Sequence, residues 1–436
     1  MNKIIFILVF IILSNCSLNE NSKFWSASKE INQEPVSEKQ TISREIIDQD
    51  KIYNEEFNPG LKIIIPETFF SSNDKSYTNN DGKTNFNGNL KYLSKYKFSK
   101  IKNFYQYEPE IVFDENNIIF FNNKGTIIKF DDNSKVKWKK NYYSKSEKKL
   151  NPVLQFAKKN NYLIVTDNLA RYYMLDTITG NLIWSKNNIA PFNSQIKIFK
   201  DKFYTIDFSN TLRCFSIENG KELWNVKTQQ SLIRSQKKLS IVFVENVIFF
   251  NNSNGDISAV NLLNGELLWQ LPTQNSLIYE SSFSLETSDL VTDNKSLFFS
   301  NNKNQFFSID INTGSFNWDT KINSNVRPTI IGNILFTISM EGYLFLIDKE
   351  KGNIIRVTDI FSNFKIKKRN YIKPTGFILG KENIYLSTNN GKLLVIDIKT
   401  GKTISTLKID NEKILRPFVF NDQLFIVKDN SIIKLN

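Results

Sequence analysis

An all-β architecture is predicted for this chain: an eight-bladed β-propeller whose blades are four-stranded antiparallel sheets. Three features predict it. A glycine followed four residues later by tryptophan recurs along the chain, successive copies are 38 to 49 residues apart, and eight short apolar hairpins accompany them. A period of this size, built from strand-type units, is typical of a propeller with one four-stranded sheet per blade.

The repeat is clearest at residues 309–318. Gly314 suits a tight turn between two strands, because glycine adopts positive φ without steric cost. Trp318 then falls on the following strand, where a large ring can fill the space against a neighbouring sheet. Three further full copies and three partial copies follow the same spacing: Gly180 with Trp184, Gly220 with Trp224, Gly265 with Trp269, Gly352 with Arg356, Gly401 with Ser405, and Ser134 with Trp138.

Residues 1–15 resemble a signal peptide. A basic start precedes an unbroken apolar run at 4–13, which has secretory length and is too short to span a bilayer. The run leads into Leu-Ser-Asn-Cys at 13–16, which resembles a bacterial lipobox and implies that Cys16 becomes the lipidated first residue of the mature protein. Ser17, rather than aspartate, after the cysteine implies transfer to the outer membrane. The alternative is a cleaved secretory signal with an incidental cysteine.

Residues 16–88 are expected to form a lipid-anchored, largely disordered tether. The segment is rich in Asn, Ser, Lys and Glu and has little periodicity, so it would space a folded domain from the membrane. Trp25 and the apolar run at 61–65 are exceptions. Three explanations are open for them: docking on a partner, docking on the propeller, or residual hydrophobicity.

The propeller is expected to occupy residues 89–436. Its first inner hairpin joins residues 118–121 to 126–130 through an Asn-Asn-Lys-Gly tip. Apolar runs of four to six residues, alternating or continuous, suit half-buried and fully buried strands. Seven equivalent hairpins begin near Tyr162, Phe203, Val247, Leu297, Ile334, Ile384 and Leu424.

The last unit decides the topology. Residues 423–436 complete a third strand without a final turn and outer strand, and an incomplete blade would leave an open edge. The run at 96–104 is a candidate for the missing strand. We therefore predict eight blades closed by pairing of an N-terminal strand with the last blade. Seven blades are the alternative if the weak first unit is not a blade.

The composition limits the chemistry available. The chain has no histidine, which removes the Ser-His-Asp triad and the commonest zinc ligand. With Cys16 acylated, Cys214 is the only free thiol, so no internal disulfide forms, and a buried apolar filler is its expected role. The sequence contains no phosphate-binding glycine motif and no calcium loop. We expect no catalytic residue, metal or cofactor.

Recurring acidic residues have a structural explanation. An aspartate four residues before the repeat glycine can bond the backbone of its own turn, as expected for Asp176, Asp310, Asp348 and Asp397. The net charge of +13 comes from lysines spread along the chain. No cluster of lysines and aromatic residues typical of a nucleic-acid site stands out.

The repeat Asp-x-x-x-Gly-x-x-x-Trp is similar to that of the pyrroloquinoline-quinone (PQQ) dehydrogenases and their non-enzymatic relatives. Within this group the chain resembles, over residues 90–436, the BamB family of lipoproteins of the outer-membrane β-barrel assembly machinery, and the lipobox supports this separately. The resemblance implies a non-enzymatic scaffold on the periplasmic face of the outer membrane that aids folding and insertion of outer-membrane proteins. PQQ dehydrogenases carry a vicinal disulfide; this chain has no adjacent cysteines, so PQQ is not expected.

The resemblance also implies a binding site for the periplasmic POTRA region of BamA, the barrel-inserting partner. Leu232, Ile233 and Arg234 match a family loop in which leucine and arginine contact that region. A second family loop carries two acidic residues; Glu286 matches one of them and Ser284 replaces the other. An exposed apolar pair beside an arginine is typical of a protein-binding hot spot. The alternative is an ordinary connection between blades whose Leu and Ile point inward.

Other partners and functions are open. Blade edges and loops are a candidate surface for unfolded outer-membrane proteins. One alternative is that the chain is a degenerate quinoprotein-like propeller enzyme, and stoichiometric PQQ or calcium in the purified protein would be evidence for it. The other alternative is a periplasmic propeller that binds a glycan or another ligand, and saturable glycan binding would be evidence for it.

Overall fold

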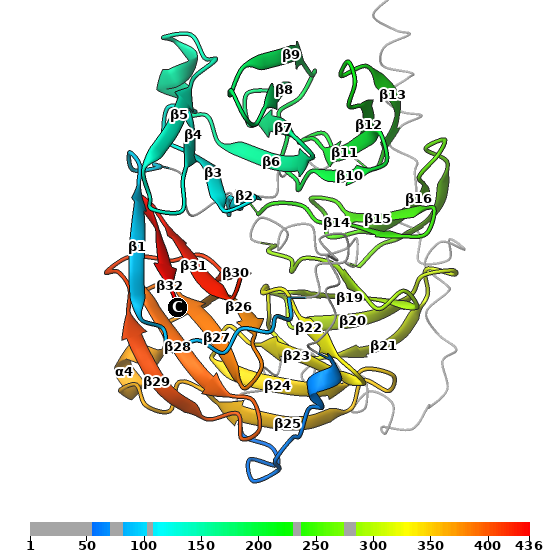
Figure 1. Cartoon of the computed structure of the whole chain (residues 1–436). Helices are drawn as coiled ribbons and strands as arrows, with labels where there is room; N and C mark the ends of the chain where they lie inside the picture. The colour runs from blue at the N-terminus through cyan, green and yellow to red at the C-terminus, as the bar shows by residue number, and fades with distance from the viewer. Residues whose placement is uncertain (1–54, 70–81, 103–107, 230–236, 274–284) are drawn as a thin grey trace, which may run out of the picture. The chain divides into compact units, whose positions relative to one another are not determined.

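The computed structural model describes residues 55–69, 82–102, 108–229, 237–273 and 285–436. These residues form eight four-stranded antiparallel sheets arranged in a ring, as Figure 1 shows. Within these ranges, three short helices accompany the sheets: η2 (Glu67–Phe69), η3 (Glu147–Leu150) and α4 (Ile366–Arg369). None of the described helices has the length and apolar character needed to cross a membrane. The predicted eight-bladed all-β propeller is confirmed, and the seven-bladed alternative is wrong.

Blades are numbered along the chain. Blade 1 contains β2 (Val112–Asp114), β3 (Asn117–Phe121), β4 (Ile127–Phe130) and β5 (Val136–Lys140), and blade 2 contains β6 (Leu154–Lys159), β7 (Tyr162–Asp167), β8 (Arg171–Asp176) and β9 (Leu182–Asn187). Blade 3 contains β10 (Lys197–Phe199), β11 (Lys202–Ile206), β12 (Thr211–Ser216) and β13 (Glu222–Lys227), and blade 4 contains β14 (Ile241–Val244), β15 (Val247–Asn251), β16 (Ile257–Asn261) and β17 (Leu267–Leu271). Blade 5 contains β18 (Val291–Thr292), β19 (Ser296–Asn301), β20 (Gln305–Asp310) and β21 (Phe316–Thr320), and blade 6 contains β22 (Thr329–Ile331), β23 (Ile334–Ile338), β24 (Tyr343–Asp348) and β25 (Ile354–Asp359). Blade 7 contains β26 (Pro374–Leu379), β27 (Asn383–Thr388), β28 (Lys392–Asp397) and β29 (Thr403–Lys408). Blade 8 contains β30 (Phe418–Phe420), β31 (Gln423–Lys428), β32 (Ser431–Leu435) and, from the N-terminal side of the chain, β1 (Tyr92–Lys97).

The inner hairpins follow the apolar runs of the sequence. All five residues of β3 and all four of β4 are buried, because neighbouring sheets cover both faces of the second and third strands. The core between blades 3 and 4, for example, brings Tyr204 and Cys214 together with Ile241 and Ile248. Fourth strands such as β13 alternate between exposed and partly buried residues. The hairpins predicted from the sequence are confirmed as the second and third strands of the eight blades.

The repeat tryptophan joins each blade to the next. Trp269, on β17, packs on Gly314 in the turn of blade 5, and its Nε1 donates a hydrogen bond to the Ile311 carbonyl at 3.0 Å. Three other indoles make the same bond: Trp138 to Thr177 at 3.1 Å, Trp184 to Ile217 at 2.9 Å, and Trp318 to Lys349 at 3.0 Å. The glycine and the tryptophan of one copy therefore act in different interfaces, because each ring packs on the glycine of the following blade.

The aspartate of the repeat holds the turn, as predicted. Its Oδ1 accepts a hydrogen bond from the backbone amide three residues later: 2.7 Å for Asp176, 2.8 Å for Asp310, 2.8 Å for Asp348 and 2.6 Å for Asp397. The backbone bonds from Thr179 and Thr313 are the main reason that the pKa values of Asp176 and Asp310 lie below the ordinary value. The carboxylates of these aspartates therefore stabilise the turns of the propeller.

The ring closes through the N-terminal side of the chain. β1 pairs antiparallel with β32, and Figure 1 shows the two strands, blue and red, side by side. The predicted closure is confirmed, but the strand begins at Tyr92 rather than at Tyr96. The reason is the burial of Tyr96, whose ring contacts Phe130 of blade 1 and Phe425 of blade 8 and so lies inside the strand.

The chain upstream of β1 also packs against the propeller. Phe57 forms a β-bridge with Val357 of blade 6, and Phe86 is fully buried beside Tyr385 of blade 7. The described part of the segment expected to be a tether therefore contacts the propeller, upstream of residue 89, where the repeat domain was expected to begin. Residues 16–54 lie outside the described part of the chain.

The apolar run at 61–65 docks on blades 6 and 7. Ile63 and Ile65 pack against the core between these blades, and the Leu61 carbonyl accepts a hydrogen bond from Arg356 at 2.8 Å. Arg356 takes the place of the repeat tryptophan in blade 6 and also donates to the Ile398 carbonyl of blade 7 at 3.2 Å. Of the three explanations for this run, docking on the propeller is the one observed.

Candidate partner-binding face

The two faces of the propeller carry different connections. Because successive antiparallel strands reverse direction, turns between the first and second strands and between the third and fourth lie on one face. Turns between the second and third strands, and the linkers from blade to blade, lie on the other, which we call the linker face. The repeat glycines are on the opposite face. The predicted partner residues all belong to two linkers, 228–240 between β13 and β14 and 272–290 between β17 and β18.

The structure describes one of the four predicted contact residues. Leu232, Ile233 and Arg234 lie outside the described residues, as does Cys16, so these assignments stay predictions. Glu286 is described, and its side chain is exposed on the linker face. Its backbone amide donates a hydrogen bond at 2.9 Å to the side chain of Asn302, in the turn between β19 and β20.

Asn325 connects the bases of the two predicted loops. The Lys237 ammonium donates a hydrogen bond to the Asn325 carbonyl, and the Asn325 side-chain amide donates to the Glu286 carboxylate. Asn325 lies between β21 and β22, so three consecutive linkers meet at this residue. Sequence reasoning missed Asn325, because it is 39 positions from Glu286 and 88 from Lys237 and no local pattern marks it.

Linker 228–240 is held at both ends. The Thr228 hydroxyl donates to the Asn210 carbonyl at 2.9 Å, and the Asn210 side chain donates to the Gln229 carbonyl at 3.0 Å. At the other end Leu239 is buried, and its amide donates to the Asn193 carbonyl at 2.8 Å. The part of the linker that carries the predicted contact residues thus starts and ends at fixed points.

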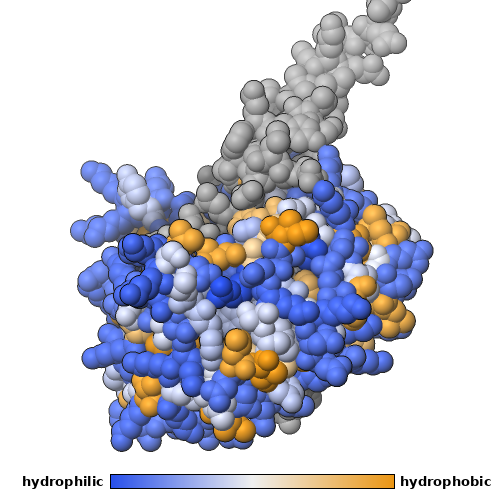
Figure 2. All heavy atoms as spheres, turned by 90° about the horizontal axis from the view of Figure 1, so that it is seen from above, coloured by the Kyte–Doolittle hydropathy of each residue, from blue (hydrophilic) through white to orange (hydrophobic). Residues whose placement is uncertain are grey.

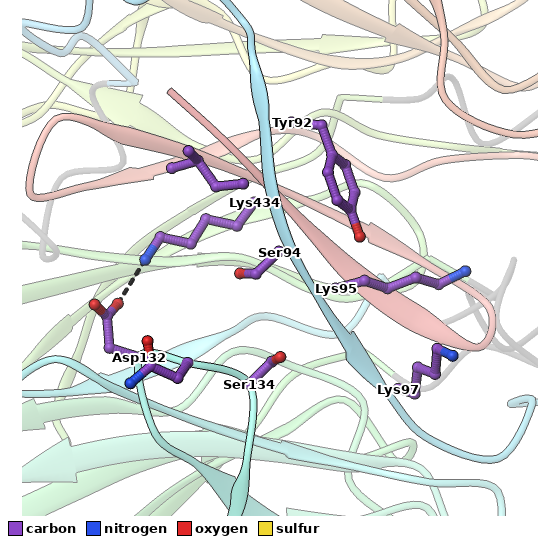
Figure 3. A pocket seen from close by; sticks show the side chains of 9 residues that line it. Tyr92, Ser94, Lys95, Lys97, Asp132, Ser134 and Lys434 are labelled. Carbon is purple, nitrogen blue, oxygen red and sulfur yellow. Dashed lines mark hydrogen bonds and ion pairs between the residues drawn. The ribbon is translucent and has the colours of Figure 1, made fainter.

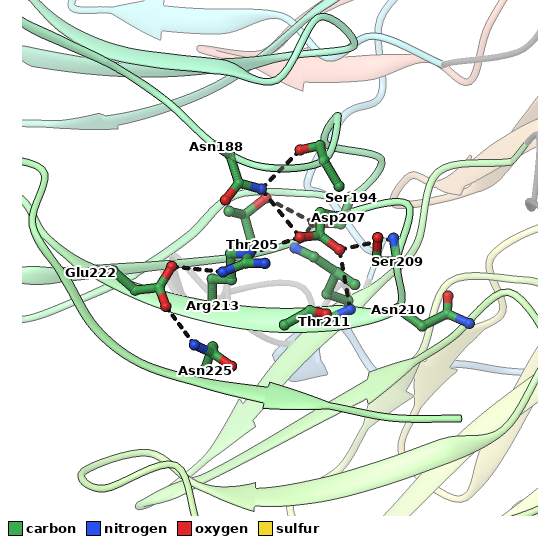
Figure 4. Close-up of polar contacts among 12 residues, drawn as sticks. Asn188, Ser194, Thr205, Asp207, Ser209, Asn210, Thr211, Arg213, Glu222 and Asn225 are labelled. Carbon is green, nitrogen blue, oxygen red and sulfur yellow. Dashed lines mark hydrogen bonds and ion pairs between the residues drawn. The ribbon is translucent and has the colours of Figure 1, made fainter. Parts of the chain in front are cut away.

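A buried ionic network fixes the turn that contains Asn210 (Figure 4). The carboxylate of Asp207 accepts hydrogen bonds from Arg213 Nε at 2.7 Å, from the Ser209 amide at 2.9 Å and from Asn188 Nδ2 at 3.1 Å. Burial disfavours the charge of Arg213, but its bonds to Asp207 and Glu222 outweigh burial and raise its pKa. The hydrogen bonds of this network hold β11, β12 and the preceding linker together, so its role is to position the linker face.

Exposed apolar side chains occur on several linkers. Ile189 is 93% exposed, and Ile366 and Tyr371, which flank lysines in and around α4, are 81% and 79% exposed. Seen at right angles to the view of Figure 1, apolar groups are scattered through a mostly hydrophilic surface (Figure 2). Apolar groups that remain in water on binding loops are typical of protein contact sites. Sequence reasoning missed these residues, although isoleucine and tyrosine in a lysine-rich linker were a usable signal.

An open groove of about 730 Å³ marks the seam where the ring closes (Figure 3). Ser94 takes the register position of the repeat tryptophan there, and Ser134 replaces the glycine of blade 1. Lys434 reaches across the seam to Asp132 at 2.5 Å. Besides Tyr92 and Leu93, the groove is lined by lysines and small polar side chains with a single carboxylate, which is no arrangement for acid–base or nucleophilic catalysis.

The described residues offer little reactive chemistry elsewhere. Burial raises the pKa of the Cys214 thiol to about 11, so the thiolate that reacts with electrophiles is scarce at neutral pH. Within the described ranges, no group of three or more Cys, Asp or Glu side chains is arranged to hold a metal ion. The arrangement is suited to binding through shaped loops on a rigid ring.

Comparisons with known proteins agree with the fold. The profile of a family described as outer membrane protein assembly factor BamB matches residues 123–358, more than half of the chain. BamB of Shewanella oneidensis is 19% identical over 256 residues, which cover 58% of this chain and 62% of that protein, so less than two thirds of the relative's length is spanned.

Two solved structures show the same fold at low sequence identity. BamB from Moraxella catarrhalis superimposes with a TM-score of 0.64 at 15% identity, covering 80% of this chain and 99% of that one. The C-terminal WD40 domain of Sif2 gives a TM-score of 0.57 at 12% identity, covering 80% of this chain and 98% of that one. Both are propeller matches at the level of fold. The family profile goes further, and with its match over more than half of the sequence, the chain belongs to the BamB family of outer membrane protein assembly factors.

Proposed function

We propose that this protein is a non-enzymatic scaffold of outer-membrane protein assembly that binds BamA. Membership of the BamB family and the eight-bladed propeller support this role. The mechanism is binding and orientation without a covalent step: a rigid ring presents loops to the assembly machinery and so aids folding and insertion of outer-membrane proteins. The buried Cys214 and the structural use of the repeat aspartates support a role that needs no catalysis.

The contact site is the part of the linker face around Asn325, and the POTRA region of BamA is its partner. The observation that carries this assignment is the junction of Lys237, Asn325 and Glu286, which ties together the bases of both predicted loops. Fixing a loop before binding reduces the entropy lost on association. Leu232 and Ile233 would supply apolar contact, and Arg234 would hold a carboxylate of the partner with two parallel hydrogen bonds.

The protein acts at the periplasmic face of the outer membrane, anchored through acylated Cys16. Fourth strands supply a second surface, for segments of unfolded outer-membrane proteins. They form the outer edges of the blades and keep partly exposed apolar side chains, among them Leu223, Leu267 and Phe316. An exposed strand edge is able to pair with an extended chain.

Affinity capture from solubilised cell envelopes tests the BamA contact. We expect the wild type to capture BamA, and Leu232→Ala and Arg234→Ala to capture at least tenfold less, because hot-spot residues contribute about 2 kcal/mol or more each. Asn325→Ala should also weaken capture, because it releases Glu286 and removes the contact that unites the two loops.

Matched variants away from the linker junction serve as controls. Leu263→Ala removes an exposed leucine from the turn between β16 and β17 on the opposite face, and Arg369→Ala removes an arginine of another linker that is paired with Asp359. Both should capture BamA as the wild type does. Equal capture by all variants would discard the proposed site and leave the scaffold role, whereas a folded wild type that captures no BamA would overturn the role itself.

A further inference from the structure

The linker between blades 6 and 7, residues 360–373, combines exposed apolar side chains with exposed cations. Ile366 and Tyr371 are 81% and 79% exposed. The linker contains five cationic side chains and no carboxylate. Three of its lysines are exposed and form no ion pair with a described acidic residue: Lys365, Lys367 and Lys368. A partner that complements this linker must therefore be negatively charged and must also accept apolar groups.

The backbone of the linker is fixed, so its exposed side chains project from defined positions. Phe361 is fully buried at the start of the linker. Arg369 is used inside the fold, because its guanidinium donates a hydrogen bond to the carboxylate of Asp359 at 2.7 Å. Towards the other end, the carbonyl of Tyr371 accepts a hydrogen bond at 2.9 Å from Asn389, next to β27 of blade 7. These contacts hold the main chain and leave the three lysines and both exposed apolar side chains in water.

The first described residues of the chain lie beside this linker. Phe57 pairs with Val357 of β25, and its amide donates to the Val357 carbonyl at 3.1 Å. The Glu56 carboxylate accepts a hydrogen bond at 3.1 Å from the amide of Asp359, the residue directly before the linker. Figure 1 shows α4 on the outside of the ring, beside β29. The chain that follows the proposed lipid anchor at Cys16 therefore first meets the described propeller next to the exposed lysines.

We propose that linker 360–373 is a membrane-contact site that binds the surface of a bilayer containing anionic phospholipids. The three exposed lysines lie against lipid phosphates, and Ile366 and Tyr371 enter the boundary between headgroups and acyl chains. Tyrosine suits this boundary because its ring is apolar and its hydroxyl is polar. The inference rests on the proposed location at the outer membrane, and it gives the propeller a second attachment besides the acylated Cys16.

A bilayer fits this linker better than an acidic protein does. A stable protein interface buries about 800 Å² on each partner, and two exposed apolar side chains on one linker supply only a small part of that area. A bilayer surface needs no such shape match, because lipids rearrange around inserted groups. The contact can also be weak, since a lipid anchor on the same chain keeps the linker at a high effective concentration near the membrane.

Vesicle binding by residues 17–436 tests the contact, because this chain lacks the proposed acyl chains but contains every described residue. The probes are vesicles of phosphatidylglycerol mixed with phosphatidylcholine, and vesicles of phosphatidylcholine alone. We expect the chain to sediment with the mixed vesicles and not with the neutral ones. Binding should weaken at high salt, because salt screens the attraction between lysines and phosphates.

Variants separate the contribution of charge from that of apolar contact. Lys367→Glu combined with Lys368→Glu should weaken binding at least roughly tenfold, because each lysine near an anionic surface contributes roughly fivefold in affinity. Ile366→Ser should weaken binding several-fold and leave its dependence on salt unchanged, since it removes apolar contact alone. All three side chains are exposed, so the unfolding midpoint of each variant should match that of the wild type.

Matched controls change exposed side chains in other blades. Lys137→Glu combined with Lys139→Glu, on β5, makes the same change of charge. Ile178→Ser, between β8 and β9, removes an isoleucine that is also exposed. Both controls should bind the mixed vesicles as the wild type does.

A dye at position 366 measures insertion directly. Ile366→Cys provides a single reactive thiol, because Cys214 is the only other cysteine in residues 17–436 and is buried. The fluorescence of an environment-sensitive dye attached there should rise when mixed vesicles are added. The same dye at Ile178→Cys should not respond.

The proposal is overturned if the wild type does not bind the mixed vesicles, if neutral vesicles bind equally well, or if the linker variants bind as the controls do. A dye at position 366 that responds to purified BamA and not to vesicles would assign the linker to a protein instead. These results are separate from the scaffold role, because capture of BamA from detergent needs no bilayer. Lys367→Glu combined with Lys368→Glu should therefore capture BamA as the wild type does.

Discussion

Single glycines set how closely neighbouring blades approach. At Gly314 the backbone has φ +71°, and a Cβ would lie 2.6 Å from the indole of Trp269. Any other residue is therefore disfavoured at this position for two reasons: the backbone conformation, and the close packing of the preceding blade. The pairing of glycine and tryptophan in the sequence thus records a contact between blades as well as a turn.

Gly314→Ala should lower the free energy of unfolding by about 2 kcal/mol or more, since the alanine is strained at positive φ and displaces the indole. Chemical denaturation followed by tryptophan fluorescence measures the change. Gly60→Ala is the matched control, because no atom lies within 4 Å of its added Cβ and its φ is not in the left-handed region, so it should be near neutral. Equal stability of Gly314→Ala and the wild type would contradict the steric explanation.

Among the strands, β1 has the largest effect on the whole ring, because it completes blade 8 and covers blade 1. Tyr96 is its anchor: the ring is fully buried between Phe130 and Phe425, and its hydroxyl donates to the Asp132 carbonyl at 3.1 Å. This hydroxyl takes over the bond that an indole makes at four other interfaces. Closure is therefore achieved with different residues from those of the repeat.

Tyr96→Ala should cost about 3–5 kcal/mol, as for other large aromatic side chains removed from a core, because it opens a cavity at the seam. Tyr92→Ala, at the exposed start of the same strand, should change stability by less than about 0.5 kcal/mol. Urea unfolding of both variants gives the comparison. If the two variants lost the same stability, Tyr96 would not be the anchor of the closing strand.

Prediction from sequence succeeds for elements whose signal is local. The turn at Asp310–Gly314 and the buried run of β3 are each specified within ten residues, so the hairpins and the number of blades followed from the period. The start of β1 was misplaced because both of its halves contain aromatic residues, and only packing between two blades selects Tyr96 as an interior residue. A repeat pattern contains no information about such a contact.

At the scale of the whole molecule, the candidate sites consist of residues that only the closed ring brings together. Asn325 meets Lys237 and Glu286 because consecutive linkers emerge side by side on one face. Lys238 meets Glu110 because linkers from distant parts of the chain converge on the axis. Sequence reasoning found the loops through a family resemblance, and it could not find the junction or the ion pairs near the axis, whose members are individually ordinary polar residues.

Ion pairs near the axis of the ring, such as that of Arg327 with Asp289, should also determine how the molecule responds to acid. Burial alone would raise the pKa of Asp289, but the charges of Arg327, Lys238 and Lys237 outweigh burial and hold it below the ordinary value of 3.8. A carboxylate whose pKa is lowered by folding stabilises the folded state above its unfolded pKa. That stabilisation is lost as the pH falls below 3.8 through the lower pKa of the folded state.

Asp289→Asn should therefore lower the free energy of unfolding at pH 7 by about 3 kcal/mol, because it leaves the buried Arg327 guanidinium with only the more distant carboxylate of Glu110, 3.7 Å away. The same variant should lose less stability than the wild type between pH 4 and pH 2, since the group that titrates in the folded state is absent. Urea unfolding at several pH values measures both effects, with Asp319→Asn on the exposed face of β21 as the control that should follow the wild type. A parallel acid profile for Asp289→Asn and the wild type would mean that the axial ion pairs do not link the stability of the ring to pH.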